Sequence, residues 1–456
     1  MEAWTALVAT AAPAQRPAPV EVTGRRGHLD SRLPVEDMAV ACVASALMAA
    51  SALHQQRNGS HSPASLDRSH VAAAVRSERY FRRGEQWAGV GFASLSRFWR
   101  AADGWVRTHA NYPWHRAALL STLGISEDVE AVAAAVAERR AEDIEEEVFA
   151  AGGVAGAVRS LDTWRAHAQG RAVSREPLIG HHTTGDALPR LRPPAELPAS
   201  DVRVLDLTRV IAGPVCTRYL AALGADVLRL DPPHHPDMRG GEVADTLLGK
   251  RSAMLDLRSR AGVARLHDLL DHADVVVCGY RPGTLDQFGL SETALAERHP
   301  GVVVVYLAAW GHRGPWAARR GFDSVVQAPT GIAMSESITD DEPAVLPCQL
   351  LDHGTGYVAA AAALDGLRRQ ADQGGTHARR VSLARTAWWL TSTPVAPEPA
   401  AMAASETNTA SWVVELDSPD GRVTAVLPPG HLGNRPLTWP SPVSGYGNDP
   451  TAWPPG

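Results

Sequence analysis

Cysteine is scarce in this chain, and its few cysteines are not spaced for a shared structural role. Four are scattered over 456 residues, and no two form a CxxC pair: Cys42, Cys216, Cys278 and Cys348. This spacing predicts neither a disulfide framework nor a zinc site. Because disulfides are typical of oxidising compartments, their absence favours a reducing, cytoplasmic location.

The sequence also lacks motifs that identify several common enzyme classes. It has no GxGxxG, so no nicotinamide dinucleotide site is predicted, and it has no GxSxG elbow of a hydrolase. The pairs His181-His182 and His234-His235 lie in polar stretches, without helical HxxxH spacing and a third ligand. We therefore expect no bound metal.

Charge and hydropathy argue against two kinds of partner. The 44 basic and 50 acidic residues nearly balance, and no basic block stands out, so nucleic acid is not expected. The longest apolar run, Met38–Leu53, is too short to span a bilayer and predicts a buried helix. The Ala-rich stretch Leu7–Ala14 follows no positively charged segment and makes a poor signal peptide. No membrane association is therefore expected.

An alternation of strands and helices begins after the Pro-rich linker Leu191–Pro198. Short β-branched runs predict strands at Val202–Leu207, Val227–Leu230, Ala253–Leu257, Val275–Cys278 and Val302–Leu307. Helical stretches lie among them at Pro214–Leu223, Arg260–His272 and Thr284–Arg298. This alternation predicts parallel βαβ units, and the continuously apolar strands predict a sheet covered on both faces. The expected fold is a doubly wound, Rossmann-like α/β domain.

The two ends of the chain have other patterns. The region before the linker is mainly helical and includes the Ala-rich segment Val129–Ala151. Leu33–Asp37 with the helix after it resembles Leu346–Asp352 with the helix after that, which indicates either a weak duplication or two unrelated Ala-rich helices. Near the C-terminus, Trp412–Leu416 and Arg422–Leu427 predict a hairpin, and loops are expected beyond it.

The first βα turn of the predicted sheet contains Gly213 and Pro214. Glycine permits a close approach of the backbone, and proline suits the first turn of a helix. A helix N-terminus at the carboxyl edge of a parallel sheet favours an anion. An ordinary strand-to-helix turn has the same residues, so both interpretations stay open.

Basic and aromatic residues lie beside two further strands. Tyr280 and Arg281 follow one strand, and Lys250 and Arg251 precede another. If they converge, the ring can stack on a base and the cations can hold a nucleotide phosphate. As separate surface side chains they would have no shared function.

Asp352 is the carboxylate that the sequence favours as a nucleophile. It stands directly before the helix predicted at Tyr357–Leu367, where the helix dipole favours the ionised form that a nucleophile needs. Asp is also a preferred N-cap, so a purely structural role is the alternative.

Six segments of the chain together resemble the class III (family III) CoA-transferases, in the order that the family has them. They are Val204–Pro214, Leu223–Val227, Lys250–Ser252, Tyr280–Gly283, Gly321–Gly331 and Leu351–Gly356. Each motif is weak alone, but their common order makes the resemblance specific.

The resemblance implies covalent catalysis. An aspartate at the position of Asp352 would attack an acyl-CoA thioester to give an aspartyl anhydride and CoA thiolate, which is later recaptured. The implied CoA groove is lined by Ile211, Ala212, Lys250, Arg251, Tyr280 and Arg281. The implied partners are an acyl-CoA and a small carboxylic acid, with coenzyme A as a substrate and no permanently bound cofactor. A homodimer is the implied assembly.

The order of the domains departs from the family. Asp103–Val106 and Phe149–Arg165 resemble the small domain, which normally follows the catalytic helix but here precedes it. A rearranged or partly duplicated order is therefore predicted: residues 1–85 a weak copy of the catalytic-helix region, 86–190 a small-domain-like block, 191–200 a linker, 201–392 the α/β domain, and 393–456 a terminal hairpin and loop tail. The block at 86–190 is expected to cover the groove.

Three positions bear on the alternatives to a CoA-transferase. Pro232 stands where the family commonly has a basic residue and Gly279 where it has Asn, which favours a non-catalytic CoA-binding partner subunit. A racemase or isomerase of the same superfamily would use a His/Asp pair, and here Phe322 stands where racemases tend to have His. The leading hypothesis is the transferase.

Overall fold

The protein is described from a computed structural model. The described residues are 19–87, 91–237, 245–339, 341–395, 409–419, 421–439 and 445–454.

A seven-stranded sheet forms the centre of the molecule, with the order β11-β10-β9-β12-β13-β14-β8. Its strands are β8 (Gly180–Thr184), β9 (Arg203–Leu207), β10 (Asp226–Asp231), β11 (Arg251–Met254), β12 (Val275–Cys278), β13 (Val303–Ala308) and β14 (Thr376–Ser382). All neighbours pair in parallel except β8, which joins β14 antiparallel. The prediction of a doubly wound parallel sheet is confirmed.

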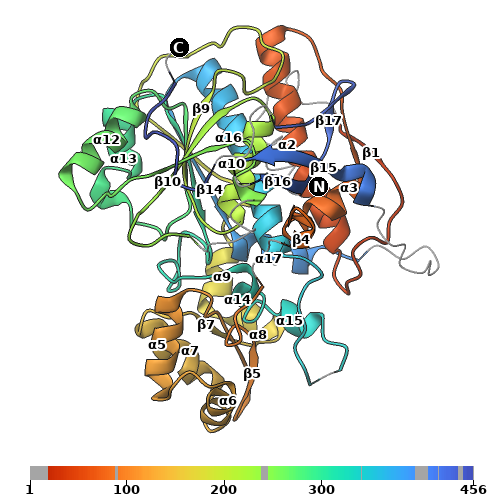
Figure 1. The fold of residues 1–456 in the computed structure, drawn as a ribbon, viewed down its shortest axis with the longest axis vertical. Helices are drawn as coiled ribbons and strands as arrows, with labels where there is room; N and C mark the ends of the chain where they lie inside the picture. Colours follow the sequence, from red (N-terminus) through yellow and green to blue (C-terminus); the bar gives the residue numbers. More distant parts are fainter. Residues whose placement is uncertain are drawn as a thin grey trace.

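Helices cover both faces of this sheet (Figure 1). Successive side chains of a strand point to opposite faces, so Val275 and Val277 belong to one buried cluster while Val276 belongs to another. The first cluster contains residues of α10 (Ala212–Ala222) and α16 (Leu350–Gln373), and the second contains residues of α12 (Arg260–Leu270) and α13 (Glu292–Arg298). Burial on both faces explains why these strands read as continuous apolar runs.

One predicted helix of the sheet domain is wrong. The segment Thr284–Arg298 forms only the 3₁₀ turn η2 (Asp286–Phe288) and then α13. Gly289 ends the turn with a φ of 77°, and the Ser291 side chain accepts the Ala294 N–H to start α13. A left-handed residue followed by a new N-cap interrupts the helix.

A second long helix, α2 (Val35–Asn58), packs against α16. In the described part of the chain it is the one helix whose length and composition would suit a membrane span, and most of its apolar stretch is buried inside the protein. The predicted burial of Met38–Leu53 is confirmed, and the helix is longer than that run because polar residues extend it at both ends.

The region of residues 91–157 has a hydrophobic core of its own and lies at one end of the molecule (Figure 1). Three strands, β5 (Phe98–Ala101), β6 (Gly104–Thr108) and β7 (Ala155–Ala157), pack with α5 (Pro113–Leu123), α6 (Val129–Ala137) and α7 (Ala141–Ala150). The Ala-rich segment Val129–Ala151, expected to be helical, forms two helices, α6 and α7. The backbone becomes extended at Arg140, with ψ 140°, which breaks the helical hydrogen bonding.

The C-terminal segment pairs with strands from near the N-terminus. The predicted hairpin is present as β15 (Val413–Ser418) and β16 (Gly421–Val426), and β16 also pairs with β3 (Arg82–Arg83), beside β4 (Gln86–Trp87). The tail beyond it was expected to be loops, but β17 (His431–Leu432) and β18 (Arg435–Pro436) join β2 (Ala64–Asp67) and β1 (Glu21–Thr23) in a second small sheet. Strands from near the N-terminus and strands from the C-terminal segment thus pair with each other in two small sheets.

Candidate functional site

A cavity of about 660 Å³ opens at the carboxyl edge of the central sheet. It is lined by the loops after β9, β10, β12 and β13, by the first turn of α16 and by α5. This is where ligands bind in open parallel α/β sheets, and the volume suits a small organic ligand.

The turn after β9 lines the cavity, and its backbone has an unusual conformation. Val210 has a φ of 68°, which is rare for a β-branched residue, and its N–H donates to the Asp237 carboxylate at 3.0 Å. At Gly213 an added Cβ would lie 2.3 Å from the Thr208 side chain, so only glycine fits. Ala212, another residue expected in a CoA groove, starts α10 and lines the cavity.

Asp352 lines the same cavity and is the third residue of α16. It was expected just before the helix, but the helix begins at Leu350, seven residues ahead of the predicted start at Tyr357, and includes it. The residue is 5% exposed, and its N–H donates to the Asp323 carboxylate at 3.0 Å. The first turn of a long helix favours a negative charge at this position.

Asp323, the first residue of the short helix α14 (Asp323–Val326), accepts a hydrogen bond from the start of α16. It is fully buried, and burial raises its pKa from 3.8 to about 6, while the hydrogen bond from the Asp352 N–H opposes the rise. Gln327 donates its amide to Asp323 and accepts the Leu346 N–H at 3.0 Å. This chain of bonds fixes the position of the Asp352 turn. The sequence gives no local signal for this role of Asp323, because its partner lies 29 residues away.

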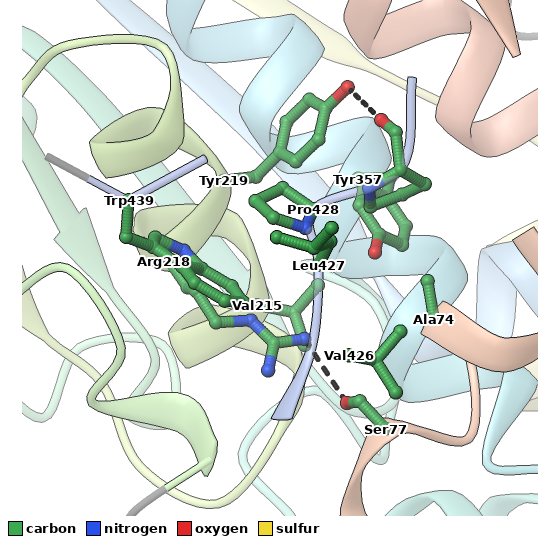
Figure 2. Close-up of a pocket in the computed structure, with 11 residues that line it drawn as sticks. Ala74, Ser77, Val215, Arg218, Tyr219, Tyr357, Val426, Leu427, Pro428 and Trp439 are labelled. Atoms are coloured by element: carbon green, nitrogen blue, oxygen red, sulfur yellow. Dashed lines mark hydrogen bonds between the residues drawn. The ribbon is translucent and has the colours of Figure 1, made fainter. Parts of the chain in front are cut away.

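The residue after Asp352 connects α16 to the N-terminal part of the chain. His353 lies 3.1 Å from the carboxylate of Glu78 in α4 (Ser77–Tyr80), and both side chains are buried. The neighbouring Ser77 accepts a hydrogen bond from Arg218 of α10, as Figure 2 shows. That figure views a cleft of about 10 Å³ beside α10, room for about one water molecule, so it is a packing gap rather than a ligand site.

Tyr280 and Arg281, two of the residues expected in a CoA groove, also line the cavity. The Arg281 guanidinium donates to the Ala318 carbonyl at 3.3 Å, and no carboxylate of the described residues forms an ion pair with it. Pro232 and Gly279, the two positions that depart from the family pattern, line the same cavity.

The other predicted groove residues are not brought to this cavity. Lys250 is buried and donates to Asp206 at 3.0 Å, and burial lowers its pKa to about 8 although the ion pair opposes the shift. Arg251 pairs with Asp226 at 2.7 Å. Lys250 stands just before β11, and its ammonium also donates to the Pro214 carbonyl of α10 at 2.9 Å, so it is held in the interior of the protein. Arg251 is the first residue of β11, and neither residue lines the cavity. Ile211 is 3% exposed and packs in the core.

Several cavity residues come from α5 in the N-terminal region and were not identified from the sequence. The ring of Trp114 lies 4.7 Å from Tyr112 and 4.8 Å from His235, which follows β10. The Tyr112 hydroxyl donates to Asp237 at 2.5 Å, and this bond connects the N-cap of α5 to the segment after β10. The contacts to His235 and Asp237 join residues more than a hundred positions apart, and no local pattern predicts them. Within the described residues, no three potential metal ligands gather.

Comparison with known proteins identifies the region that holds most of this site. Residues 199–411 match the model of CoA-transferase family III. This part of the chain belongs to that family. A probable fatty acyl-CoA transferase of Mycobacterium tuberculosis is 33% identical over 188 residues, which cover 37% of this chain and 46% of that protein. The succinyl-CoA–D-citramalate CoA-transferase of Chloroflexus aurantiacus is 32% identical over 40% of this chain and 48% of its own length.

Similar solved structures also match only part of this chain. A crystal structure of the M. tuberculosis protein is 32% identical and covers 43% of this chain and 56% of its own, with a TM-score of 0.41. A CAIB/BAIF family protein from Brucella suis is 25% identical over 50% of this chain and 65% of its own, with a TM-score of 0.39. The chain spans about half the length of the curated CoA-transferases that it matches.

Proposed function

We propose that this chain moves CoA between an acyl-CoA thioester and a carboxylic acid, through an anhydride on Asp352. The observation that carries the proposal is the position of this carboxylate in the first turn of α16, on the wall of a ligand-sized cavity in a family III region. At 5% exposed it is shielded from bulk water, which would hydrolyse an anhydride.

The proposed chemistry uses the carboxylate as a nucleophile. A carboxylate oxygen of Asp352 attacks the thioester carbonyl, the C–S bond breaks, and CoA leaves as a thiolate. The acceptor carboxylate then displaces the donor acid, so that Asp352 carries the acceptor's acyl group as an anhydride. The thiolate attacks that acyl carbonyl, the new thioester forms, and Asp352 leaves as a carboxylate. No oxidant and no net proton transfer are needed.

The cavity offers groups for the nucleotide part of CoA. Arg281 lies beside Tyr280, which can present a ring to a base while the guanidinium holds a phosphate. Coenzyme A would enter as a substrate. Lys250 takes no part in this proposal, because its ammonium is buried, paired with Asp206 and hydrogen-bonded to the Pro214 carbonyl.

Trapping the intermediate tests the proposal. The protein is incubated with an acyl-CoA and then with hydroxylamine, and its peptides are searched by mass spectrometry for a hydroxamate at Asp352. Asp352→Asn and a sample without acyl-CoA are the controls. Consumption of acyl-CoA by transfer to an acid, with no hydroxamate under any condition, would overturn the covalent role.

An acyl-CoA racemase or isomerase is the second candidate, because His115 lines the cavity and its ring meets Phe322 edge-on at 5.7 Å. Such an enzyme removes the proton next to the thioester carbonyl. It would therefore incorporate deuterium from D₂O into an acyl-CoA in the absence of any acceptor acid. The transferase proposal predicts no such exchange.

A further inference from the structure

A separate cavity of about 380 Å³ lies at the antiparallel pair β8 and β14 and has no part in the function proposed above. It is lined by α9 (Ala168–Ser174) and the segment after it, by β8, by β14 and by the loop after β13. Its volume falls in the usual range of small-ligand sites, about 300–1,000 Å³. Its arginines are Arg175, Arg313 and Arg380, and its other titratable side chains are Glu176, His181 and His312. Three arginines around one ligand-sized cavity indicate an anion site.

Two carboxylates beside these arginines already have partners of their own. Glu176 accepts the His312 N–H at 2.8 Å, so it holds the backbone of the loop after β13. Glu292 of α13 pairs with Arg380 and also lies 3.0 Å from the His182 ring. Of the three arginines, only Arg380 is therefore in an ion pair among the residues that the structure describes.

Arg175 and Arg313 have no such carboxylate partner within the described ranges. Arg175 is the C-cap of α9, and Arg313 belongs to the loop after β13. Burial raises the pKa of Glu176, and the charge of Arg313 opposes the rise without an ion pair. Both arginine side chains are exposed, so a dissolved anion can reach them. Positive charges that protein carboxylates do not neutralise in a concave site attract an anion.

Gln169 of α9 holds the loop of Arg313 next to the helix that ends at Arg175. Its side-chain amide donates to the Trp310 carbonyl at 2.6 Å and to the Arg313 carbonyl at 2.8 Å. Its side-chain oxygen accepts the Trp316 N–H at 2.8 Å, and the residue is fully buried. The backbone that carries the two arginines is thus fixed before a ligand arrives, which lowers the entropy cost of binding.

The cavity suits a phosphate monoester better than a carboxylate. Phosphate monoesters have a charge of about −1.5 to −2 at neutral pH and three strong acceptor oxygens, enough for arginines from three different elements. His181 adds no charge, because burial lowers its pKa to about 4, with further lowering from the charges of Arg379 and Arg369. Its uncharged ring, stacked on that of His377, can contact the organic part of the ligand.

We propose that this cavity binds a small phosphate monoester, held by Arg175, Arg313 and Arg380. The inference does not rest on the proposed function. This cavity shares no lining residue with the one that Asp352 lines, so the phosphate monoester and an acyl-CoA can bind at the same time. The 3′-phosphate of CoA has the same chemistry and is the other source that a test must separate.

Calorimetric titration of the intact chain with inorganic phosphate and with glycerol 3-phosphate tests the site. Both should bind with dissociation constants below about 10 mM, and acetate at the same ionic strength should not. Arg175→Gln and Arg313→Gln should each weaken phosphate binding by about 10-fold or more, the range of a charge-assisted hydrogen bond. Arg171→Gln is the matched control, since this exposed arginine of α9 donates to the Ala166 carbonyl and does not line the cavity.

A gain of affinity separates recognition from damage to the fold. Glu292→Gln removes the carboxylate that competes for Arg380, so it should tighten phosphate binding by about twofold to fivefold, the range of a partly exposed ion pair. A variant that merely unfolds cannot bind phosphate more tightly. Weaker binding in Glu292→Gln would contradict the assignment of Arg380.

Arg281→Gln and CoA locate the bound phosphate. Phosphate affinity should stay unchanged in Arg281→Gln, whose position lines the other cavity, and in the presence of saturating CoA. The inference would be overturned by a wild type that binds no phosphate, by equal losses in Arg171→Gln and Arg313→Gln, or by a loss in Arg281→Gln alone. Displacement of phosphate by CoA but not by dephospho-CoA would assign the arginines to the 3′-phosphate of CoA and would also overturn it. None of these measurements requires transferase activity, so a failure to trap a hydroxamate leaves this test intact.

Discussion

The two longest helices, α2 and α16, begin in the same way but meet different surroundings. Each has 24 residues, and the third of each is an aspartate, Asp37 and Asp352. Their N-caps also agree, since Pro34 has φ −76° and ψ 52° and Gln349 has φ −78° and ψ 64°, without side-chain capping in either. Both helices are followed by a strand and another helix.

The surroundings give the two aspartates different chemistry. Asp37 forms ion pairs with Arg26 at 3.1 Å and with Arg68 at 2.9 Å. Asp352 lines the cavity, and its turn is held by Asp323 through the backbone. A carboxylate held between two arginines is stabilised as an anion and is a poor nucleophile. The same local start of a helix therefore leaves one aspartate in ion pairs and places the other on the wall of a cavity.

The largest effect is expected when each aspartate is replaced by asparagine. Asp352→Asn removes the proposed nucleophile, so kcat for CoA transfer should fall by about 10³-fold or more, while folding and CoA affinity persist. Asp37→Asn should change kcat by less than about twofold, because its carboxylate only holds arginines. Steady-state kinetics and CoA titration measure both. A rate as high as a tenth of the wild-type value in Asp352→Asn would refute the covalent role. An equal fall in kcat in both variants would show that the two aspartates do not differ in function.

A smaller effect, on stability, is expected from the carboxylate that accepts a backbone N–H at the start of each helix, which is Asp323 for α16. Because burial raises the pKa of Asp323 to about 6, its contribution to stability is fully present below pH 3.8 and is lost as pH rises through about 6. The loss is on the order of 3 kcal/mol at most, from a rise of that size in pKa. The unfolding free energy of the wild type, relative to Asp323→Asn, should therefore fall between pH 4 and pH 7 in urea titrations.

Glu336 is the counterpart at α2, where it accepts the Leu33 N–H at 3.2 Å, and burial raises its pKa as well. It is less completely buried than Asp323, so Glu336→Gln should remove a smaller part of the pH dependence. Identical pH profiles for the wild type and Asp323→Asn would show that Asp323 does not titrate in this range.

The smallest effect tests how closely α16 packs against its two neighbours. An added Cβ at Gly356 would lie 2.5 Å from the Ala212 carbonyl of α10, and the backbone must shift. At Gly354 it would lie 3.2 Å from the Cys42 sulfur of α2, a side chain that can move. Gly356→Ala should lower the unfolding free energy by about 1–3 kcal/mol. Gly354→Ala should stay within about 1 kcal/mol, because alanine favours helix. Equal costs in urea denaturation would contradict this difference.

Sequence patterns predicted the apolar strands of the sheet but missed two polar ones. β14 contains Arg379, which is buried because it pairs with Asp365 of α16 at 3.0 Å. A strand whose polar side chains are neutralised by another element has no apolar run to reveal it. β8, at the edge of the sheet, contains the His181-His182 pair and was assigned to a polar loop for the same reason.

The candidate site was predicted in part. Ala212, Tyr280 and Asp352 line the cavity because each follows a strand or begins a helix at the carboxyl edge of the sheet. Lys250 and Arg251 were expected beside them but do not line the cavity, because they stand at the start of β11 and pair with Asp206 and Asp226. The sequence indicated that all these residues are close to strand ends, but these ion pairs join segments that are distant in the chain, and no local pattern predicts them.

The sequence by itself determined the parallel sheet, the family of the region 199–411 and the aspartate at the start of α16, because these follow from local periodicity and from motifs in a fixed order. Only the tertiary structure decided which of two similar aspartates faces the cavity and which is held by arginines. It also brought His115 of α5 into the cavity that Arg320 lines. These outcomes depend on contacts between distant segments, where burial and neighbouring charge set the chemistry of each side chain.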